Sequence, residues 1–100
     1  MIRLLYKDVN CKVSISISED LNLPMAHIEI NGWSLSLYKR YLLVIGSCLN
    51  LIKEEGVLSI YAIARTEKAQ KFNSLFGFSP ISDVIDKETN NIYKLMRLEC

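Results

Sequence analysis

The stretch from residue 57 to residue 78 limits the fold more than any other part of the sequence. Its first eight residues are almost all apolar, which is typical of a strand covered on both faces rather than a half-exposed one. Thr66 then offers a hydroxyl that can cap a helix, and Gly77 followed by Phe78 is a common way to end one. The pattern predicts a buried strand, a tight corner and a short helix.

The residues before this stretch predict strands first. Residues 12–18 alternate strictly between apolar and polar side chains, which indicates a half-buried antiparallel strand. Residues 26–30 continue the alternation, and residues 1–6 have the composition of an edge strand. Asn31 and Gly32 then form a strong turn signal, because both tolerate positive φ.

A long amphipathic helix is expected over residues 37–55. Apolar residues recur there at three- and four-residue steps and form a face able to cover a sheet. We expect residues 33–35 to be briefly extended, Ser36 to cap the helix, and Gly56 to end it. Gly46 in the middle of this helix costs about 1 kcal/mol relative to Ala.

Two more strands follow the short helix. Ser79 and Pro80 are expected to break the chain, and residues 81–85 and 92–98 then read as strands around the polar loop 86–91. A helix between strands 26–30 and 57–64 implies a right-handed crossover and a parallel pair. The chain is therefore predicted to be one domain over residues 1–100 of the α/β (α+β) class, with a mixed twisted sheet and two helices packed on it.

Composition narrows the possible partners and location. The formal net charge of +1 provides no long-range attraction to nucleic acid or to an anionic membrane. The longest wholly apolar run, residues 41–45, is too short for a membrane span. Cys11, Cys48 and Cys100 form no paired motif, which disfavours a metal site and fits a reduced, cytoplasmic setting. We expect a soluble protein that binds neither nucleic acid, membrane nor metal.

The segment 66–78 resembles the end of a GNAT domain, the fold of the Gcn5-related N-acetyltransferases. That family shows the pattern Asn-x-x-Ala-x-x-φ-Tyr-x-x-φ-Gly-Phe, where φ is an apolar residue. The residues that match it are Ala69, Phe72, Phe76, Gly77 and Phe78, whereas Thr66 replaces the Asn and Asn73 replaces the Tyr. The resemblance extends over about residues 12–98 and implies a GNAT-like sheet.

The resemblance also implies a site for acetyl-CoA, and here the sequence departs from the family. Family members cradle the pyrophosphate with a glycine-rich loop and a helix N-terminus. The corresponding stretch, residues 31–40, has Gly32 as its only glycine and places Trp33 beside it. Asn73 cannot replace a tyrosine as general acid. If the protein were active, the candidate cofactor-binding residues would be Trp33, Ser34, Ser36, Thr66 and Asn73.

A candidate base in the active alternative is Glu29, because many GNAT enzymes keep a general base on this strand. Its neighbour on the same face is His27. The simpler interpretation is an ordinary solvated strand face. The sequence leaves two roles open for Trp33 and Tyr38: an exposed aromatic patch for a partner, or a plug where the cofactor would enter.

A narrower resemblance is to acetyltransferase-like internal virion proteins of some short-tailed bacteriophages, which are small and have a similarly eroded phosphate loop. The start of the long helix at residues 33–36 and the terminal polar hairpin are similar to that group. We therefore predict a degenerate GNAT-like domain without cofactor, acting through contacts with virion components or with itself, in the host cytoplasm or the virion. The alternative is an active N-acetyltransferase that uses acetyl-CoA.

Overall fold

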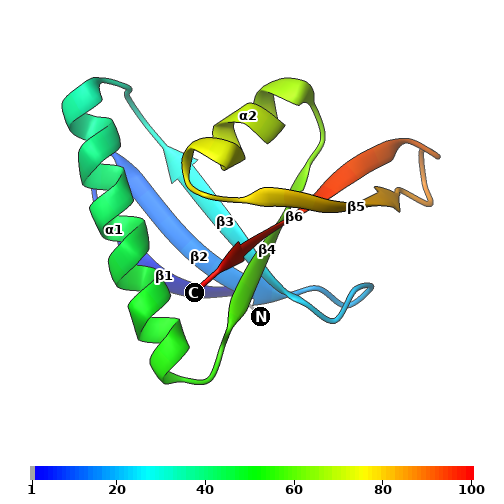
Figure 1. The fold of residues 1–100 in the computed structure, drawn as a ribbon, viewed down its shortest axis with the longest axis horizontal. Helices are drawn as coiled ribbons and strands as arrows, with labels where there is room; N and C mark the ends of the chain where they lie inside the picture. The colour runs from blue at the N-terminus through cyan, green and yellow to red at the C-terminus, as the bar shows by residue number, and fades with distance from the viewer. Residues whose placement is uncertain (1) are drawn as a thin grey trace.

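The computed structural model describes residues 2–100 and contains six strands and two helices (Figure 1). Met1, the first residue of the strand expected at 1–6, lies outside the described residues. In chain order the elements are β1 (Ile2–Lys7), β2 (Cys11–Ile17), β3 (Pro24–Ile30), α1 (Leu35–Glu54), β4 (Ser59–Ala64), α2 (Glu67–Leu75), β5 (Ser79–Ile85) and β6 (Ile92–Glu99).

All six strands form one mixed sheet in the order β1-β2-β3-β4-β6-β5. Neighbouring strands are antiparallel except β3 and β4, which are parallel and joined through α1. The expected parallel pair and the predicted fold class are therefore confirmed. The expectation that the apolar run in β4 is covered on both faces was wrong: Ile60, Ala62 and Ala64 pack in the core, whereas Tyr61 and Ile63 on the other face are only half-buried.

The two halves of the sheet meet at one place. Met25 of β3 and Tyr61 of β4 form the one registered pair between these strands. Beyond it β3 leads away to the start of α1 and β4 leads to α2, so the strands diverge (Figure 1). The ends of β3 and β4 thus leave a wedge-shaped opening in the sheet, with the beginnings of the two helices beside it.

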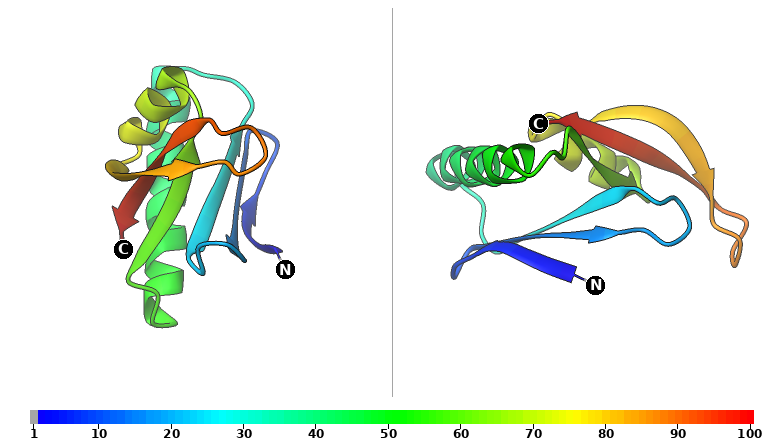
Figure 2. Two further views of the ribbon diagram at one scale, coloured as in Figure 1. Left: turned by 90° about the vertical axis from the view of Figure 1, so that its right-hand side faces the viewer. Right: turned by 90° about the horizontal axis from the view of Figure 1, so that it is seen from below.

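Both helices pack on the same face of the sheet (Figure 2). The periodicity of α1 predicts this, because its buried residues recur at steps of three and four. Side chains from α1, from three strands and from the segment that follows α2 share one continuous core. Its buried members are Cys11, Val13, Tyr41, Ile45, Cys48, Ile52, Ile60, Ala64, Phe76, Phe78 and Met96.

The long helix begins earlier than the sequence suggests. Ser34, not Ser36, is the N-cap, and its Oγ accepts a hydrogen bond of 3.1 Å from the backbone N–H of Leu37. Residues 33–35 therefore form no strand, and the expectation of a brief return strand was wrong. Both serines satisfy the local rule for a cap, and the choice is set by Gly32, whose φ of +95° turns the chain into the helix at once.

The short helix has the predicted ends. Thr66 Oγ1 accepts a hydrogen bond of 3.0 Å from the N–H of Ala69, so the predicted cap is confirmed. Gly77 has a φ of +97° and follows the last turn, as a left-handed helix end requires. Phe78 is buried in the shared core, and Phe72 packs on Phe76 with ring centroids 5.1 Å apart.

The expected break at Ser79 and Pro80 was wrong, because both residues belong to β5. A proline removes a ladder donor, but β5 is an edge strand, so the missing N–H costs little there. The register shifts between Pro80 and Ser82, which marks a bulge just after the proline.

Among the described residues, α1 has the length and composition that would let a helix cross a membrane. Tyr41, Ile45, Cys48 and Ile52 on one side of it are buried against the sheet. A helix that covers the core of a soluble domain satisfies the same criteria, so we treat α1 as a sheet-packing helix.

Two ion pairs fix α1 against β1. At one end Arg3 donates to both carboxylate oxygens of Glu55, at 2.5 and 2.8 Å. At the other end Arg40 contacts Asp8 in the β1–β2 turn. Asp8 also accepts hydrogen bonds from the Tyr6 hydroxyl at 2.5 Å and from backbone N–H groups of the turn. The start of β1 therefore lies beside the end of α1, and the two elements run in opposite directions.

We expect opposite effects from alanine at two glycines. A Cβ at Gly46 would meet no atom within 4 Å, so Gly46→Ala should raise the free energy of unfolding by about 0.5–1 kcal/mol. A Cβ at Gly77 would lie 3.0 Å from Leu98 at positive φ, so Gly77→Ala should lower it by about 1 kcal/mol or more. Urea unfolding of the two variants measures both, and equal signs would contradict the assignment.

Acid should weaken the β1–β2 turn through Asp8. The Tyr6 hydroxyl, followed by the backbone N–H of Asn10, holds the pKa of this carboxyl below its ordinary value of 3.8. The stabilisation is therefore complete above the unfolded pKa and is lost as the pH falls through the lower folded pKa. We expect Asp8→Asn to lose less stability than the unmodified chain when the pH is lowered from 5 to below about 3.

The control for this measurement is Asp20→Asn, at an exposed position in the β2–β3 turn. In denaturant unfolding across the pH series, this variant should lose about as much stability in acid as the unmodified chain does. Identical slopes for all three proteins would show that Asp8 does not stabilise the fold through its charge.

Candidate functional site

The loop between β3 and α1 is the stretch in which the sequence resemblance implies a site for the cofactor phosphates. Two side chains hold its backbone. Tyr41, buried in α1, donates its hydroxyl to the carbonyl oxygen of Gly32 at 2.8 Å, and Asn10 Nδ2 donates to the carbonyl oxygen of Asn31 at 2.9 Å. Because a carbonyl bonded in this way faces its donor, the loop is fixed from the core side as well as from the β1–β2 turn.

Trp33 extends from this loop into a group of five rings, which we call the aromatic cluster. The other members are Tyr38 and Tyr41 from α1, Phe72 from α2, and Phe76, which directly follows α2. The Trp33 ring centroid lies 5.4 to 6.4 Å from those of the other four, distances typical of packed aromatic pairs. The Trp33 residue keeps an exposed fraction of 54%, so it closes the surface of the cluster.

Tyr38 connects the two helices directly. Its hydroxyl donates to the carbonyl oxygen of Leu75 at 2.8 Å, and its ring lies 5.9 Å from that of Phe76. This carbonyl lies in the last turn of α2, where backbone carbonyl groups have no N–H partner within the helix. The start of α1 is thus attached to the end of α2 by a hydrogen bond and by stacked rings.

Most of the candidate cofactor residues cap helices or make packing contacts in the folded chain. Ser34 caps α1, and Ser36 Oγ lies 3.3 Å from Ser34 Oγ. Thr66 caps α2. The Asn73 side chain contacts Met96 Sδ at 3.5 Å. The backbone carbonyl oxygen of Asn73 accepts hydrogen bonds from the N–H groups of Phe76 and Phe78 at the helix end. Of the five candidates, Trp33 is the one that joins the two helices.

Glu29, the candidate base, lies apart from the aromatic cluster. Ile28 and Ile30 face the core beneath α1, so His27 and Glu29 lie on the opposite face of β3, both exposed. The His27 ring nitrogen Nε2 forms a 2.9 Å hydrogen bond with Ser16 Oγ across the strand pair. Glu29 lines a shallow, open hollow with Lys12 and the β1–β2 turn. The sheet itself therefore separates Glu29 from Trp33.

The residues present do not fit the pyrophosphate of acetyl-CoA. Close approach of phosphate to a helix N-terminus needs glycines and free N–H groups. Gly32 is the one glycine in the loop, Ser34 Oγ already accepts the Leu37 N–H, and the Trp33 ring packs over the first turn with Tyr38. The opening between the helices is therefore filled by this chain's own side chains.

Sequence reasoning identified Trp33 and Tyr38 but not their partners. In the sequence, Phe72 and Phe76 stand out only as matches to the GNAT pattern, and Tyr41 only as part of the apolar periodicity of residues 37–55. No local spacing relates them to Trp33, because the cluster forms only when α1 and α2 meet. Within residues 2–100, no three His, Cys, Asp or Glu side chains converge in a way that could hold a metal ion.

Comparison with known proteins supports the fold. No family model and no curated protein sequence matches the chain. Among solved structures it is similar to a point mutant of the spermidine N-acetyltransferase SpeG from Vibrio cholerae, with a TM-score of 0.63 and 14% sequence identity. The match covers 93% of this chain and 58% of that one, so the chain spans somewhat over half the length of its structural neighbour. The protein has a GNAT-like acetyltransferase fold.

Replacing Trp33 should measure how firmly the cluster is packed. About half of a tryptophan surface is buried here, so Trp33→Ala should lower the free energy of unfolding by about 1–2 kcal/mol. Leu35, two residues later and 71% exposed, is the control, and Leu35→Ala should change it by less than about 0.5 kcal/mol. Equal losses in chemical denaturation would mean that Trp33 is not held by the other rings.

Proposed function

We propose that this protein is a degenerate acetyltransferase-fold domain that binds no acetyl-CoA and acts through contacts with other proteins. The packing of Trp33 between α1 and α2 is the observation that supports this best. A ring at this position, held by four others, occupies the entrance that a cofactor would need. Opening it would break the cluster and expose aromatic surface to water, which costs free energy that binding would have to repay.

Exposed apolar side chains support the protein-contact part of the proposal. Leu43 and Leu51 lie on the surface of α1 beside β1, where both line an open hollow, and their exposed fractions are 74% and 42%. Neighbouring apolar side chains on the surface of a small domain are typical of an interaction site. They are not needed for the core, which α1 already forms with its opposite side.

The alternative, an active N-acetyltransferase, is favoured by the fold similarity to an acetyltransferase. In that case Glu29 would be the first residue to test as base, by Glu29→Gln. Its position across the sheet from Trp33 weakens this alternative. A role in the particle of a short-tailed bacteriophage and a place in the host cytoplasm or virion remain predictions from the sequence resemblance.

Thermal unfolding with and without acetyl-CoA tests the proposal. A ligand at 100 times its dissociation constant stabilises a native protein by about 2.7 kcal/mol, which is a rise in Tm on the order of ten degrees for a domain of this size. We expect no rise at millimolar acetyl-CoA or CoA. An active acetyltransferase in the same buffer serves as positive control, and a saturable upward shift for this chain would restore the enzymatic alternative.

A further inference from the structure

A groove runs between α1 and the edge strand β1. It has a volume of about 290 Å³ and an almost wholly apolar lining. Leu5 and Tyr6 form one wall, while Leu43, Val44 and Leu51 form the other, with Ser47 between them. In the described part of the chain no strand pairs with the outer edge of β1. The groove, the edge, Leu43 and Leu51 therefore form one continuous face, which we call the β1 face.

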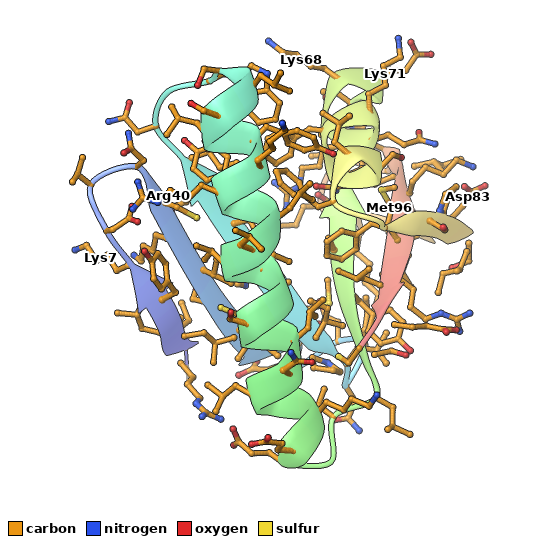
Figure 3. The ribbon with its side chains drawn as sticks, turned by 60° about the vertical axis from the view of Figure 1, so that its left-hand side comes forward. Lys7, Arg40, Lys68, Lys71, Asp83 and Met96 are labelled. Carbon is orange, nitrogen blue, oxygen red and sulfur yellow. The ribbon has the colours of Figure 1, made fainter. Side chains whose placement is uncertain are left out.

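The β1 face carries basic side chains at one end and acidic side chains at the other. Positions 40, 44, 47, 51 and 55 recur at steps of three and four and form a stripe along α1. The stripe begins with Arg40, has apolar or small side chains in the middle, and ends with Glu55. Within one chain Arg40 is paired with Asp8 and Glu55 with Arg3, so the charges left for a partner are Lys7 at the basic end and Glu54 at the acidic end. Figure 3 shows Arg40 and Lys7 on this side of α1, near the β1–β2 turn.

We propose that the β1 face binds a second copy of this chain through a twofold axis. The operation turns one α1 antiparallel to the other, so it places the basic end of each stripe opposite the acidic end of its partner. Val44 then faces Leu51 of the second copy, and Ser47 lies close to the axis. The inference rests on the proposed function, because it names the protein that makes the contact.

The charge order selects a copy over an unrelated protein. A stripe that is basic at one end and acidic at the other complements itself only when it is inverted, which is what an isologous interface does. The antiparallel arrangement also opposes the two helix dipoles favourably. The small Ser47 side chain at the midpoint allows the two helices to approach closely.

The same twofold axis can bring together both the β1 strands and the α1 helices of the two copies. The groove and cavity contacts place α1 above β1 and β2. A twofold axis that brings the two β1 edges together therefore also brings the two α1 helices side by side. The bulge between Leu4 and Tyr6 interrupts the β1 edge, so side chains rather than a continuous backbone ladder make most of the contact.

The size of the face is adequate for a dimer. A 20-residue helix is about 30 Å long, and a helix layer on a sheet layer is about 20 Å deep, so the face presents on the order of 600 Å² before side-chain relief is counted. A standard stable interface buries about 800 Å² on each partner. We therefore expect a dimer of moderate affinity rather than an obligate one.

Leu51 and Leu42 offer a matched pair of test positions. Their exposed fractions are 42% and 40%, but a step of nine positions places them on opposite sides of α1. In sedimentation velocity at concentrations on the order of 100 µM we expect the unmodified chain and Leu42→Lys to be dimers. Leu51→Lys should weaken the dimer at least about tenfold, because the new cation is placed against Val44 of the other copy, one helical turn from its Arg40. A monomeric unmodified chain, or equal effects of both variants, would overturn the proposal.

Cross-linking tests the position of the axis and, because it traps the dimer covalently, also detects a weak dimer. Cys100 is partly exposed, so the background is Cys100→Ser, in which the remaining Cys11 and Cys48 are buried. Under mild oxidation Ser47→Cys should form a disulfide-linked dimer rapidly, and Leu42→Cys should not. Absence of the Ser47→Cys cross-link, or equal rates for both, would place the contact elsewhere. Far-UV circular dichroism confirms that each variant is folded.

The two proposals fail in different measurements. A monomer whose Tm does not respond to acetyl-CoA would refute the dimer and leave the degenerate function standing. A dimer whose Tm rises with acetyl-CoA would refute the degenerate function and leave the β1 face as an interface.

Discussion

The junction between β3 and β4 is the constraint on which the rest of the structure depends. One registered pair, Met25 with Tyr61, joins a three-stranded antiparallel half to a second three-stranded half. Backbone hydrogen bonds therefore cannot hold the halves together alone. The shared core under α1 and α2 does this, with Tyr41 and Met96 completely buried from opposite sides of the junction. The helices therefore hold the two halves of the sheet together as well as covering one of its faces.

The aromatic cluster has the same role at the open end of the wedge. Where β3 and β4 diverge, the chain loses pairing partners and would expose the core between the helices. Trp33 closes this opening, and Tyr38 connects α1 to the end of α2 through its hydroxyl. In an acetyltransferase of this fold a cofactor could occupy such an opening, so the stability gained from the rings and the capacity to bind a cofactor compete for the same space.

Much of the fold could be predicted from the sequence, because local patterns determine it. The strict alternation in β2, the apolar run in β4 and the signals at Thr66 and Gly77 all correspond to observed elements. The start of α1 was missed by two residues because Ser34 and Ser36 satisfy the same capping rule, and Pro80 was misjudged because edge position is a property of the whole sheet. The partners of Trp33 could not be predicted, since they come from helices that meet only in the folded chain.

Pro80 also limits how copies of this chain can assemble. The sheet has two edges, and an association that joined β1 of one copy to β5 of the next would repeat without end and produce filaments. Pro80 has no backbone N–H to offer another strand, and the bulge that follows it disturbs the strand further. The β5 edge is therefore a poor template for another strand. The sheet is protected against open-ended growth at one edge, which leaves closed assemblies as the accessible ones.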